Sequence, residues 1–287
     1  MTQPPLLLRL RAIRPGLAPA EARVADLIEA RPRRAADQSI GGLARAADTS
    51  QTTVLRLCRR LGLKGYPQLR LALAEAAAAP HAGGAPPVRD VEAGDSVDDI
   101  ITKVSTADAL AVQETAAQLD RSALTQAGTV IAGAGRVDVY GAGASATVGL
   151  DLQQKLHRIG VVAFAWSDPH VAVASAALLS AGDVAVGISH SGTTRETVEA
   201  VVQARSRGAT TIAITNHSTS PLAREADLVL TTSARETEMR SGATASRIAA
   251  LTVIDCLYLV VAQQDLEHVR SAVARTRQSL EAHRLAP

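Results

Sequence analysis

Two segments of the sequence carry the residue types that bind a phosphate group. The first, GAGAS (141–145), directly follows the β-branched run VDVY. Gly141 and Gly143 allow backbone N–H groups to approach an anion closely, and Ser145 places a hydroxyl at the expected start of the next helix, where the helix dipole favours negative charge. This segment therefore predicts one part of an anion site.

The second segment, SHSGTTRE (189–196), is the most specific signal in the chain. Ser189, Ser191 and Thr194 place hydroxyls around Gly192, just before another expected helix. Hydroxyls and backbone N–H groups concentrated in this way favour a compact dianionic phosphate over an extended dinucleotide. The structural alternative is a Ser/Thr-rich loop whose hydroxyls only cap the helix.

A dinucleotide site, and with it a redox protein, is another interpretation of the first segment. Gly141, Gly143 and Ala146 fit the pattern Gly-x-Gly-x-x-Ala, and Asp168 follows about one strand later, where a ribose ligand would lie. Because this glycine pattern is weak by itself, the second segment decides in favour of a phosphate.

The elements that must position these loops are short strands alternating with amphipathic helices. Strands are expected at 137–140, 161–166, 183–189, 210–215 and 227–232, with helical segments between them. This alternation predicts an α/β fold with a doubly wound, mostly parallel five-stranded sheet flanked by helices. Ligands of such sheets bind at the carboxyl ends of the strands, which is where both segments lie.

Charged side chains follow the last expected strand. Glu236 and Glu238 are placed to accept hydrogen bonds from sugar hydroxyls, and Arg240 and Arg247 open a long helix. Surface ion pairing is the structural alternative for all four. The helix is apolar nearly all round over 248–262, so it must be buried on more than one side, which predicts a dimer interface.

The same region allows an enzymatic alternative. An aldose-ketose isomerase needs a base to move a proton between adjacent carbons and usually an acid to open the ring. Glu236 is the candidate base, and His190 and His217 are candidate acids, although the sequence shows no carboxylate partner for either histidine and solvated loop positions are expected for both. The basic N-terminal region has no role in that reaction, so a binding protein is favoured over an enzyme.

Charge divides the chain into two parts. Residues 1–80 contain 13 Lys and Arg against 6 Asp and Glu, whereas residues 81–287 contain 17 against 22. The N-terminal part therefore indicates a polyanionic partner. A Pro- and Gly-rich linker at 80–96 is expected to separate an N-terminal domain (1–79, the head) from a C-terminal domain (97–287, the body).

The head has the pattern of a helix-turn-helix. One amphipathic helix is expected within 18–32, a short helix follows Ser39, and Ser50 caps another helix behind a break at Asp48 and Thr49. In such a motif the second helix lies in the major groove of DNA, with its N-terminal side chains toward the bases. A helical bundle with merely solvated polar residues is the structural alternative.

Two groups of side chains are expected to contact DNA. Residues at the start of the second helix suit base edges, because Gln pairs with adenine, Arg pairs with guanine, and hydroxyls reach either bases or phosphates. These are Ser50, Gln51, Thr52, Thr53 and Arg56. Basic residues that follow can neutralise phosphates, and these are Arg59, Arg60, Lys64 and Arg70.

These segments together resemble two known modules. The order of strand, GxGxS, later strand and SxSGxTxE is similar to the sugar isomerase (SIS) domain over about residues 120–265. The head, with LGLKGYPQLR (61–70), resembles the N-terminal helix-turn-helix of the RpiR family of transcriptional regulators, and residues 233–259 resemble that family's closing stretch.

The resemblance implies a regulator that senses a sugar. Ser145, Ser189, Ser191 and Thr194 would hold the phosphate of a phosphosugar, and Glu236 and Arg247 match positions near the ligand or the subunit interface; no cofactor is implied. We therefore expect a sequence-specific DNA-binding homodimer or homotetramer whose affinity for an operator changes when the phosphosugar binds.

Composition agrees with a folded protein. Hydrophobic residues make up 47% of the chain and charged residues 20%. The apolar run at 248–262 is short for a bilayer and contains Asp255, so we expect no membrane span and a cytoplasmic location. Cys58 and Cys256 have neither metal-binding nor redox spacing, and no metal site is expected.

Overall fold

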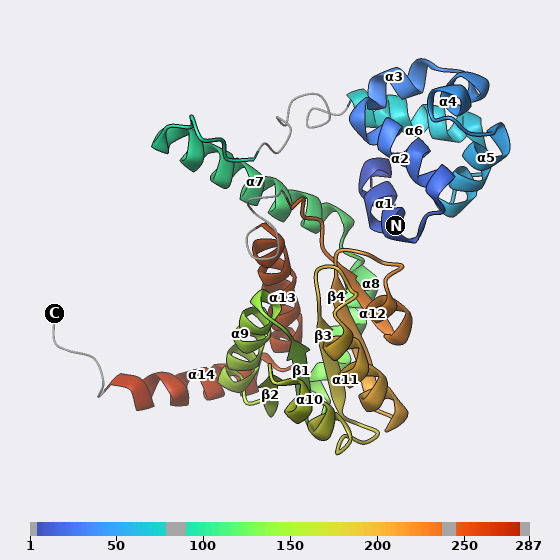
Figure 1. The fold of residues 1–287 in the computed structure, drawn as a ribbon. Helices are drawn as coiled ribbons and strands as arrows, with labels where there is room; N and C mark the ends of the chain where they lie inside the picture. The colour runs from blue at the N-terminus through green and yellow to red at the C-terminus, as the bar shows by residue number, and fades with distance from the viewer. Residues whose placement is uncertain (1–4, 79–89, 237–244, 282–287) are drawn as a thin grey trace.

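The computed structural model describes residues 5–78, 90–236 and 245–281, which form a helical head and an α/β body (Figure 1). The expected linker at 80–96 lies mostly outside these residues. The body begins at the α-helix α7 (Val97–Gln118), whose predicted cap is present because Ser96 Oγ accepts a hydrogen bond from the N–H of Asp99.

The head is built from short helices around one apolar core. They are α1 (Leu6–Ile13), α2 (Pro19–Ala30), α3 (Pro32–Asp37), α4 (Ile40–Ala46), α5 (Gln51–Arg60) and α6 (Tyr66–Ala78), with a 3-10 turn, η1 (Arg14–Gly16), after α1. Fully buried side chains from five of the helices meet in the core, among them Leu10, Ile28, Leu43, Leu57 and Leu69.

Helices α4 and α5 form the predicted helix-turn-helix. Ser39 Oγ accepts a hydrogen bond from the N–H of Gly42, and Ser50 Oγ accepts one from the N–H of Thr53, so both predicted caps are confirmed. The turn between the helices passes through Asp48, whose φ of 48° lies in the left-handed region that Asp tolerates better than most residues.

The body contains the predicted parallel sheet. Its strands are β1 (Val137–Gly141), β2 (Ala163–Trp166), β3 (Val184–Ile188), β4 (Thr210–Thr215) and β5 (Leu228–Thr231), in the order β2-β1-β3-β4-β5 and all parallel. From β1 the chain adds β2 on one side of the sheet and then β3, β4 and β5 on the other. The loops that follow β1 and β3 therefore lie side by side at the carboxyl ends of the strands.

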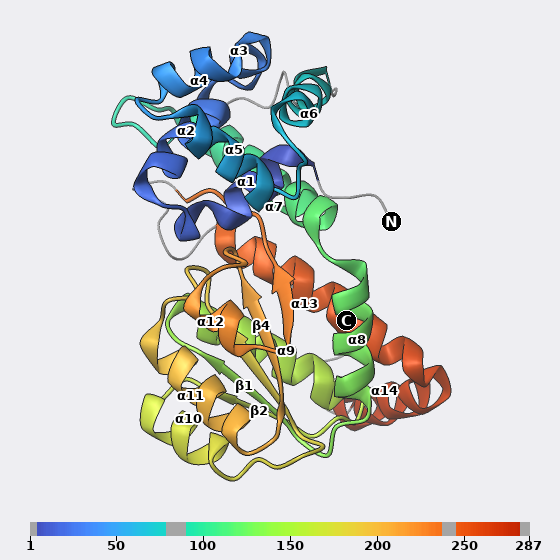
Figure 2. The same cartoon turned by 90° about the vertical axis from the view of Figure 1, so that its right-hand side faces the viewer.

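Helices cover both faces of the sheet (Figures 1 and 2). One face packs against α8 (Arg121–Ala132), α9 (Ala144–Arg158) and α13 (Ala245–Gln264). The other face packs against α10 (Pro169–Ala176), α11 (Arg195–Ser206) and α12 (Pro221–Glu225). A last helix, α14 (Leu266–Glu281), extends away from the sheet (Figure 1).

Helix α13 is long and apolar enough to cross a membrane by length and composition alone, but half of that window is buried in the body. Val253, Ile254 and Leu257 belong to the core of the body, and Asp255 is 59% exposed and pairs with Lys155 at 2.6 Å. These contacts identify α13 as a core helix.

Candidate functional site

The loop between β3 and α11 brings the predicted hydroxyls together. Ser189 Oγ lies 2.9 Å from Thr194 Oγ1 and 3.5 Å from Ser191 Oγ. Thr194 is the N-cap residue of α11 and its hydroxyl makes no capping hydrogen bond, whereas Ser189 Oγ and Ser191 Oγ accept hydrogen bonds from the loop N–H groups of Gly192 and Thr193. The first N–H groups of α11 therefore remain available to an anion.

Gly192 holds this loop in place. Its φ is +65°, and a Cβ at this position would collide with the hydroxyl of Ser220 and lie 2.8 Å from Thr215 Oγ1. The loop is tied to the next one because the carbonyl oxygen of Gly192 accepts a hydrogen bond from the N–H of Leu222 at 3.0 Å. Only glycine fits this position without rearrangement of the neighbouring loop.

The loop between β1 and α9 makes a close turn beside the first. A Cβ on Gly141 would lie 2.9 Å from the backbone of Ser145, and Gly143 has a φ of 56°. Asp168, the candidate ribose ligand, instead caps α10 by accepting a hydrogen bond from the N–H of Val171 at 3.0 Å.

A cavity with about 350 Å³ of empty volume adjoins both loops. Two of the predicted ligand residues, Ser145 and Arg247, line it together with His190. Thr215, Thr232 and Ser246 also line it and were missed by sequence reasoning, because they come from strands and a helix that only the fold brings together.

A carboxylate and two imidazoles lie close together beside the cavity, and His190 is the one of the three that lines it. His190 Nε2 lies 3.8 Å from Glu236 Oε2, and the ring centroids of His190 and His217 are 5.8 Å apart. Among the described residues, Nδ1 of each histidine and Oε1 of Glu236 are buried without a hydrogen-bond partner. Both histidines are partly buried in their loops, and the fold gives His190 an acidic neighbour that sequence spacing did not reveal.

Both imidazoles are neutral at pH 7. Burial lowers the pKa of His190, although the charge of Glu236 opposes this shift. Burial, and to a lesser extent His190, lowers the pKa of His217 to about 4. A neutral imidazole offers one donor and one acceptor, and an ionised Glu236 offers acceptors only, which together suit the hydroxyls of a sugar.

The remaining predicted residues differ in position. Arg247 is exposed in the first turn of α13, at the rim of the cavity. Glu238 and Arg240 lie outside the described residues.

Some of the predicted DNA-contacting residues have exposed side chains, and others have side chains that make hydrogen bonds within the head. Gln51, Thr52, Arg56, Arg59 and Lys64 are exposed on α5 or just beyond it. Within the part of the chain that the structure describes, the guanidinium groups of Arg56 and Arg59 have no hydrogen-bond or ion-pair partner. These five side chains are thus free to contact a partner.

The other predicted residues of this set are occupied within the head. Thr53 is only 9% exposed, and its hydroxyl lies 3.0 Å from that of Ser50. Arg60 donates a hydrogen bond to the carbonyl oxygen of Gly16 at 2.9 Å, and Arg70 donates one to that of Ala36 at 3.1 Å. These contacts stabilise the head itself, whereas the side chains of Arg60 and Arg70 are still exposed, so a phosphate contact by either stays a prediction.

Both parts of the chain match known protein families. The helix-turn-helix domain of the rpiR family matches residues 5–80, and the SIS domain matches residues 130–260. The HTH-type transcriptional regulator TTE0211 of Caldanaerobacter subterraneus, itself uncharacterised, is 38% identical over 280 residues, which are 96% of this chain and 97% of that protein. The chain belongs to the RpiR family.

Two further similarities concern the whole architecture of this RpiR-family chain. The Vibrio vulnificus NanR protein, solved in complex with ManNAc-6P, is 31% identical, has a TM-score of 0.63 and matches over 98% of this chain and 100% of that one. The bifunctional protein glk of Paraburkholderia xenovorans is 37% identical over 94% of this chain, which spans only 42% of that protein. The chain is thus an RpiR-type helix-turn-helix joined to a SIS domain, the architecture of a sugar-phosphate-sensing transcriptional regulator.

Proposed function

We propose that the head binds operator DNA, that the body binds a phosphorylated sugar, and that each ligand changes the affinity for the other. The observation that carries the proposal is the hydroxyl cluster of Ser189, Ser191 and Thr194, whose loop also supplies His190 to the wall of a cavity, in a chain that also has an exposed helix in its helix-turn-helix. A phosphate bound there would receive hydrogen bonds from the hydroxyls and from the N-terminus of α11.

The sugar ring would then occupy the cavity. His190, which lines the cavity, and Glu236, 3.8 Å from it, would offer their unpaired polar atoms to the sugar hydroxyls, and Arg247 at the rim would add a positive charge near the phosphate. Because NanR is similar over nearly the full length and was solved with ManNAc-6P, that compound is the first effector to test.

For the head, we propose that α5 enters the major groove. Gln51, Thr52 and Arg56 would face base edges, and Arg59 and Lys64 would contact phosphates. An operator can be selected from random duplex DNA with immobilised protein, and the salt dependence of its affinity would report the phosphate contacts.

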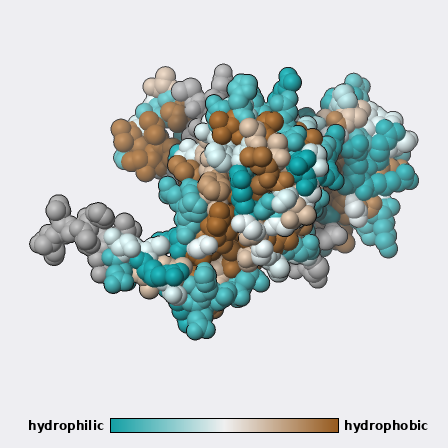
Figure 3. Space-filling view, turned by 90° about the horizontal axis from the view of Figure 1, so that it is seen from below, coloured by the Kyte–Doolittle hydropathy of each residue, from teal (hydrophilic) through white to brown (hydrophobic). Residues whose placement is uncertain are grey.

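We propose that the protein acts as a homodimer or homotetramer. Several large apolar side chains are exposed on three helices of the body: Val97 at 72% and Ile101 at 59% on α7, Leu150 at 47% on α9 and Leu259 at 62% on α13. Hydrophobic patches are visible on the face of the molecule in Figure 3. Burial of this surface between copies would stabilise an oligomer, which light scattering coupled to size-exclusion chromatography tests.

A second candidate function is isomerisation of the bound phosphosugar, supported by the contact of Glu236 with His190 at 3.8 Å. We favour a non-enzymatic sensor, because the head then has a role. Proton NMR of each phosphosugar in D2O with the protein separates the two, since an isomerase would exchange the hydrogen on the carbon beside the carbonyl.

The experiment that tests the proposed function is a thermal-shift screen. The purified protein is heated with ManNAc-6P, glucose 6-phosphate, fructose 6-phosphate, glucosamine 6-phosphate and ribose 5-phosphate, with the unphosphorylated sugars and NAD as comparisons. A ligand of the native state must raise the melting temperature. Stabilisation by a phosphosugar alone supports the proposal, and stabilisation by NAD alone contradicts it.

A further inference from the structure

The head rests on two loops of the body that also belong to the candidate effector site. The N–H and the hydroxyl of Ser218, just after β4, donate to the carbonyl oxygen of Ala12 at the end of α1, at 3.2 and 3.3 Å. A Cβ on Gly16 would lie 2.5 Å from Thr219 Oγ1, so the turn after α1 is in close contact with the same loop. Figures 1 and 2 both show α1 facing the body.

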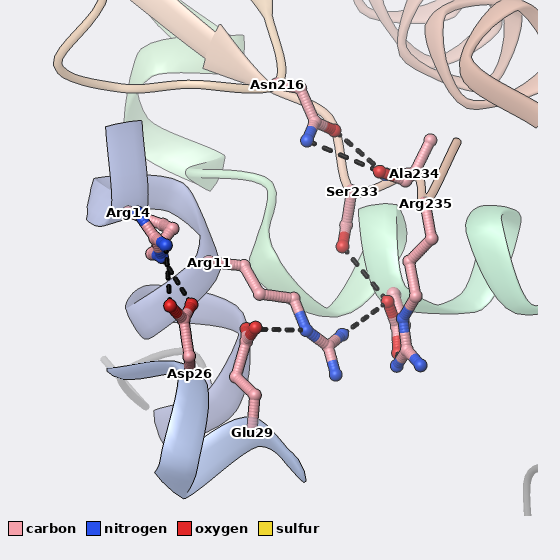
Figure 4. A network of polar contacts seen from close by, with 9 residues as sticks. Arg11, Arg14, Asp26, Glu29, Asn216, Ser233, Ala234 and Arg235 are labelled. Atoms are coloured by element: carbon pink, nitrogen blue, oxygen red, sulfur yellow. Dashed lines mark hydrogen bonds and ion pairs between the residues drawn. The ribbon is translucent and has the colours of Figure 1, made fainter. Parts of the chain in front are cut away.

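Glu114 of α7 lies at the centre of this contact. Its carboxylate accepts hydrogen bonds from Arg11 Nη1 of the head and Arg235 Nη2 of the body, both at 2.8 Å, and from Ser233 Oγ at 3.1 Å. The side chain of Glu114 is 15% exposed. Arg11 is also paired with Glu29 of the head at 3.2 Å (Figure 4). A largely desolvated carboxylate between two guanidinium groups tolerates little separation, because a lost partner leaves a charge buried and unpaired.

The segment after β5 connects this cluster to the effector cavity. Arg235 contacts Glu114, whereas the carboxylate of the next residue, Glu236, lies 3.8 Å from His190, which lines the cavity. The backbone just before these two residues is held on both sides, since the N–H of Ser233 donates to Thr115 Oγ1 at 2.9 Å and that of Ala234 donates to Asn216 Oδ1 at 2.8 Å. Because Arg235 and Glu236 are neighbours in the chain, a displacement of Glu236 would also move Arg235.

We propose that Glu114 is the positioning residue that couples the two ligand sites. When a sugar hydroxyl binds Glu236, the segment 232–236 shifts and moves Arg235. Arg235 then displaces the carboxylate of Glu114, and this displacement changes the contact with Arg11 that fixes α1 against the body. The orientation of the two heads of an oligomer then depends on occupancy of the cavity. This inference rests on the proposed function, because it supplies the physical link that the function requires.

The ligand-free part of the inference is tested by hydrogen exchange. We expect the amides of α1 to exchange several-fold faster in Glu114→Gln and Arg11→Gln than in the wild type, because the head is released from the body. Arg14→Gln is the matched control: it removes a neighbouring head charge whose partner, Asp26 at 2.7 Å, also belongs to the head. Unchanged α1 exchange in both test variants would overturn the inference whatever the effector is.

The coupling itself is tested with an operator selected by the wild type. The affinity for this DNA is measured by fluorescence anisotropy with and without each phosphosugar of the screen, and the ratio of the two dissociation constants is the coupling factor. Typical coupling factors are about 5 to 150. We expect the factor to fall to near one in Glu114→Gln and Arg11→Gln and to stay at the wild-type value in Arg14→Gln, while isothermal titration without DNA shows that all variants bind the phosphosugar alike.

A failure of the coupling role of Glu114 and a failure of the proposed function give different results. If the wild type binds neither a phosphosugar nor DNA, or shows no coupling, the proposed function fails, and α1 exchange still decides whether the head is held by Glu114. If the wild type is coupled and both test variants retain the full coupling factor, the proposed function stands and the role of Glu114 is refuted. Because Glu114 and Arg11 lie on opposite sides of the contact, one variant still tests it if the other does not fold.

Discussion

The hydroxyls of Ser189 and Thr194 lie 2.9 Å apart, at opposite ends of the loop that joins β3 to α11. This contact brings the two ends of the loop together, with Ser191 exposed between them and α11 beginning directly after Thr194. The arrangement explains why a hydroxyl-rich loop at this point of a parallel sheet can bind a compact anion.

Substitution of Ser191 tests the phosphate site. We expect Ser191→Ala to weaken phosphosugar binding by about 1.5 to 3 kcal/mol, the usual contribution of a hydrogen bond to a charged group, and to leave DNA binding without effector intact. Isothermal titration measures the first quantity and fluorescence anisotropy the second. Ser206→Ala, at the other end of α11, is the control, because its hydroxyl bonds only the carbonyl oxygen of Gln203. Wild-type phosphosugar affinity in Ser191→Ala would place the phosphate elsewhere.

Substitution of Arg56 tests the recognition helix. If Arg56 reads a base, Arg56→Ala should weaken operator binding by about 1 to 3 kcal/mol and relax specificity at one position, without an effect on phosphosugar binding. As a control, Arg195→Ala removes an exposed charge from the body, where its partner is Glu199 at 2.6 Å. An equal loss of DNA affinity in both variants would show a general charge effect and contradict the groove assignment.

Alanine substitutions at two glycines with positive φ separate the cost of backbone strain from the cost of a steric clash. Gly182 has a φ of +94° but open space around a Cβ, whereas Gly192 has a φ of +65° and contacts Ser220. We expect Gly182→Ala to lower the free energy of unfolding by about 1 kcal/mol, the conformational cost alone, and Gly192→Ala to lower it by more. Urea denaturation measures both, and equal effects would show that the loop contact at Gly192 contributes nothing.

Acidification should destabilise the body through His217. Its pKa in the folded state, about 4, is below the ordinary value of 6.5, so the unfolded chain takes up a proton at this residue while the folded chain does not. The stabilisation is therefore complete above pH 6.5 and is lost as the pH falls toward 4. His190 acts in the same direction, and the charge of Glu236 opposes both.

The measurement compares the wild type with His217→Gln. Urea denaturation at several pH values between 7 and 4.5 should show a smaller loss of stability in the variant than in the wild type. Burial raises the pKa of Glu29 in both proteins, so its contribution cancels in the comparison. A variant with the same pH dependence as the wild type would show that His217 accepts a proton freely in the folded state.

Features encoded by neighbouring residues were predictable from the sequence. Ser39 and Ser50 are helix caps followed by apolar residues at helical spacing, and β-branched runs mark all five strands. Helix α1 was not predicted, because its leucines are interrupted by Arg9 and Arg11 and no capping side chain marks its start.

Contacts between distant residues were not predictable. His190 and Glu236 meet only because the loops after β3 and β5 converge at one edge of the sheet, and Arg11 meets Glu114 although 103 positions separate them. Likewise, Thr53 and Arg60 have side chains that suit DNA, and only the packing of the head shows that they are used within it.

In the proposed function one chain links phosphosugar binding to operator binding, and a titration measures this link. The selected operator is titrated with wild-type protein in the absence and the presence of a saturating concentration of the phosphosugar that stabilises the protein, at constant salt. We predict a change in the operator dissociation constant of at least about fivefold, with the same factor in the phosphosugar affinity when DNA is present, as linkage requires. Identical operator affinity with and without every stabilising phosphosugar would contradict the account.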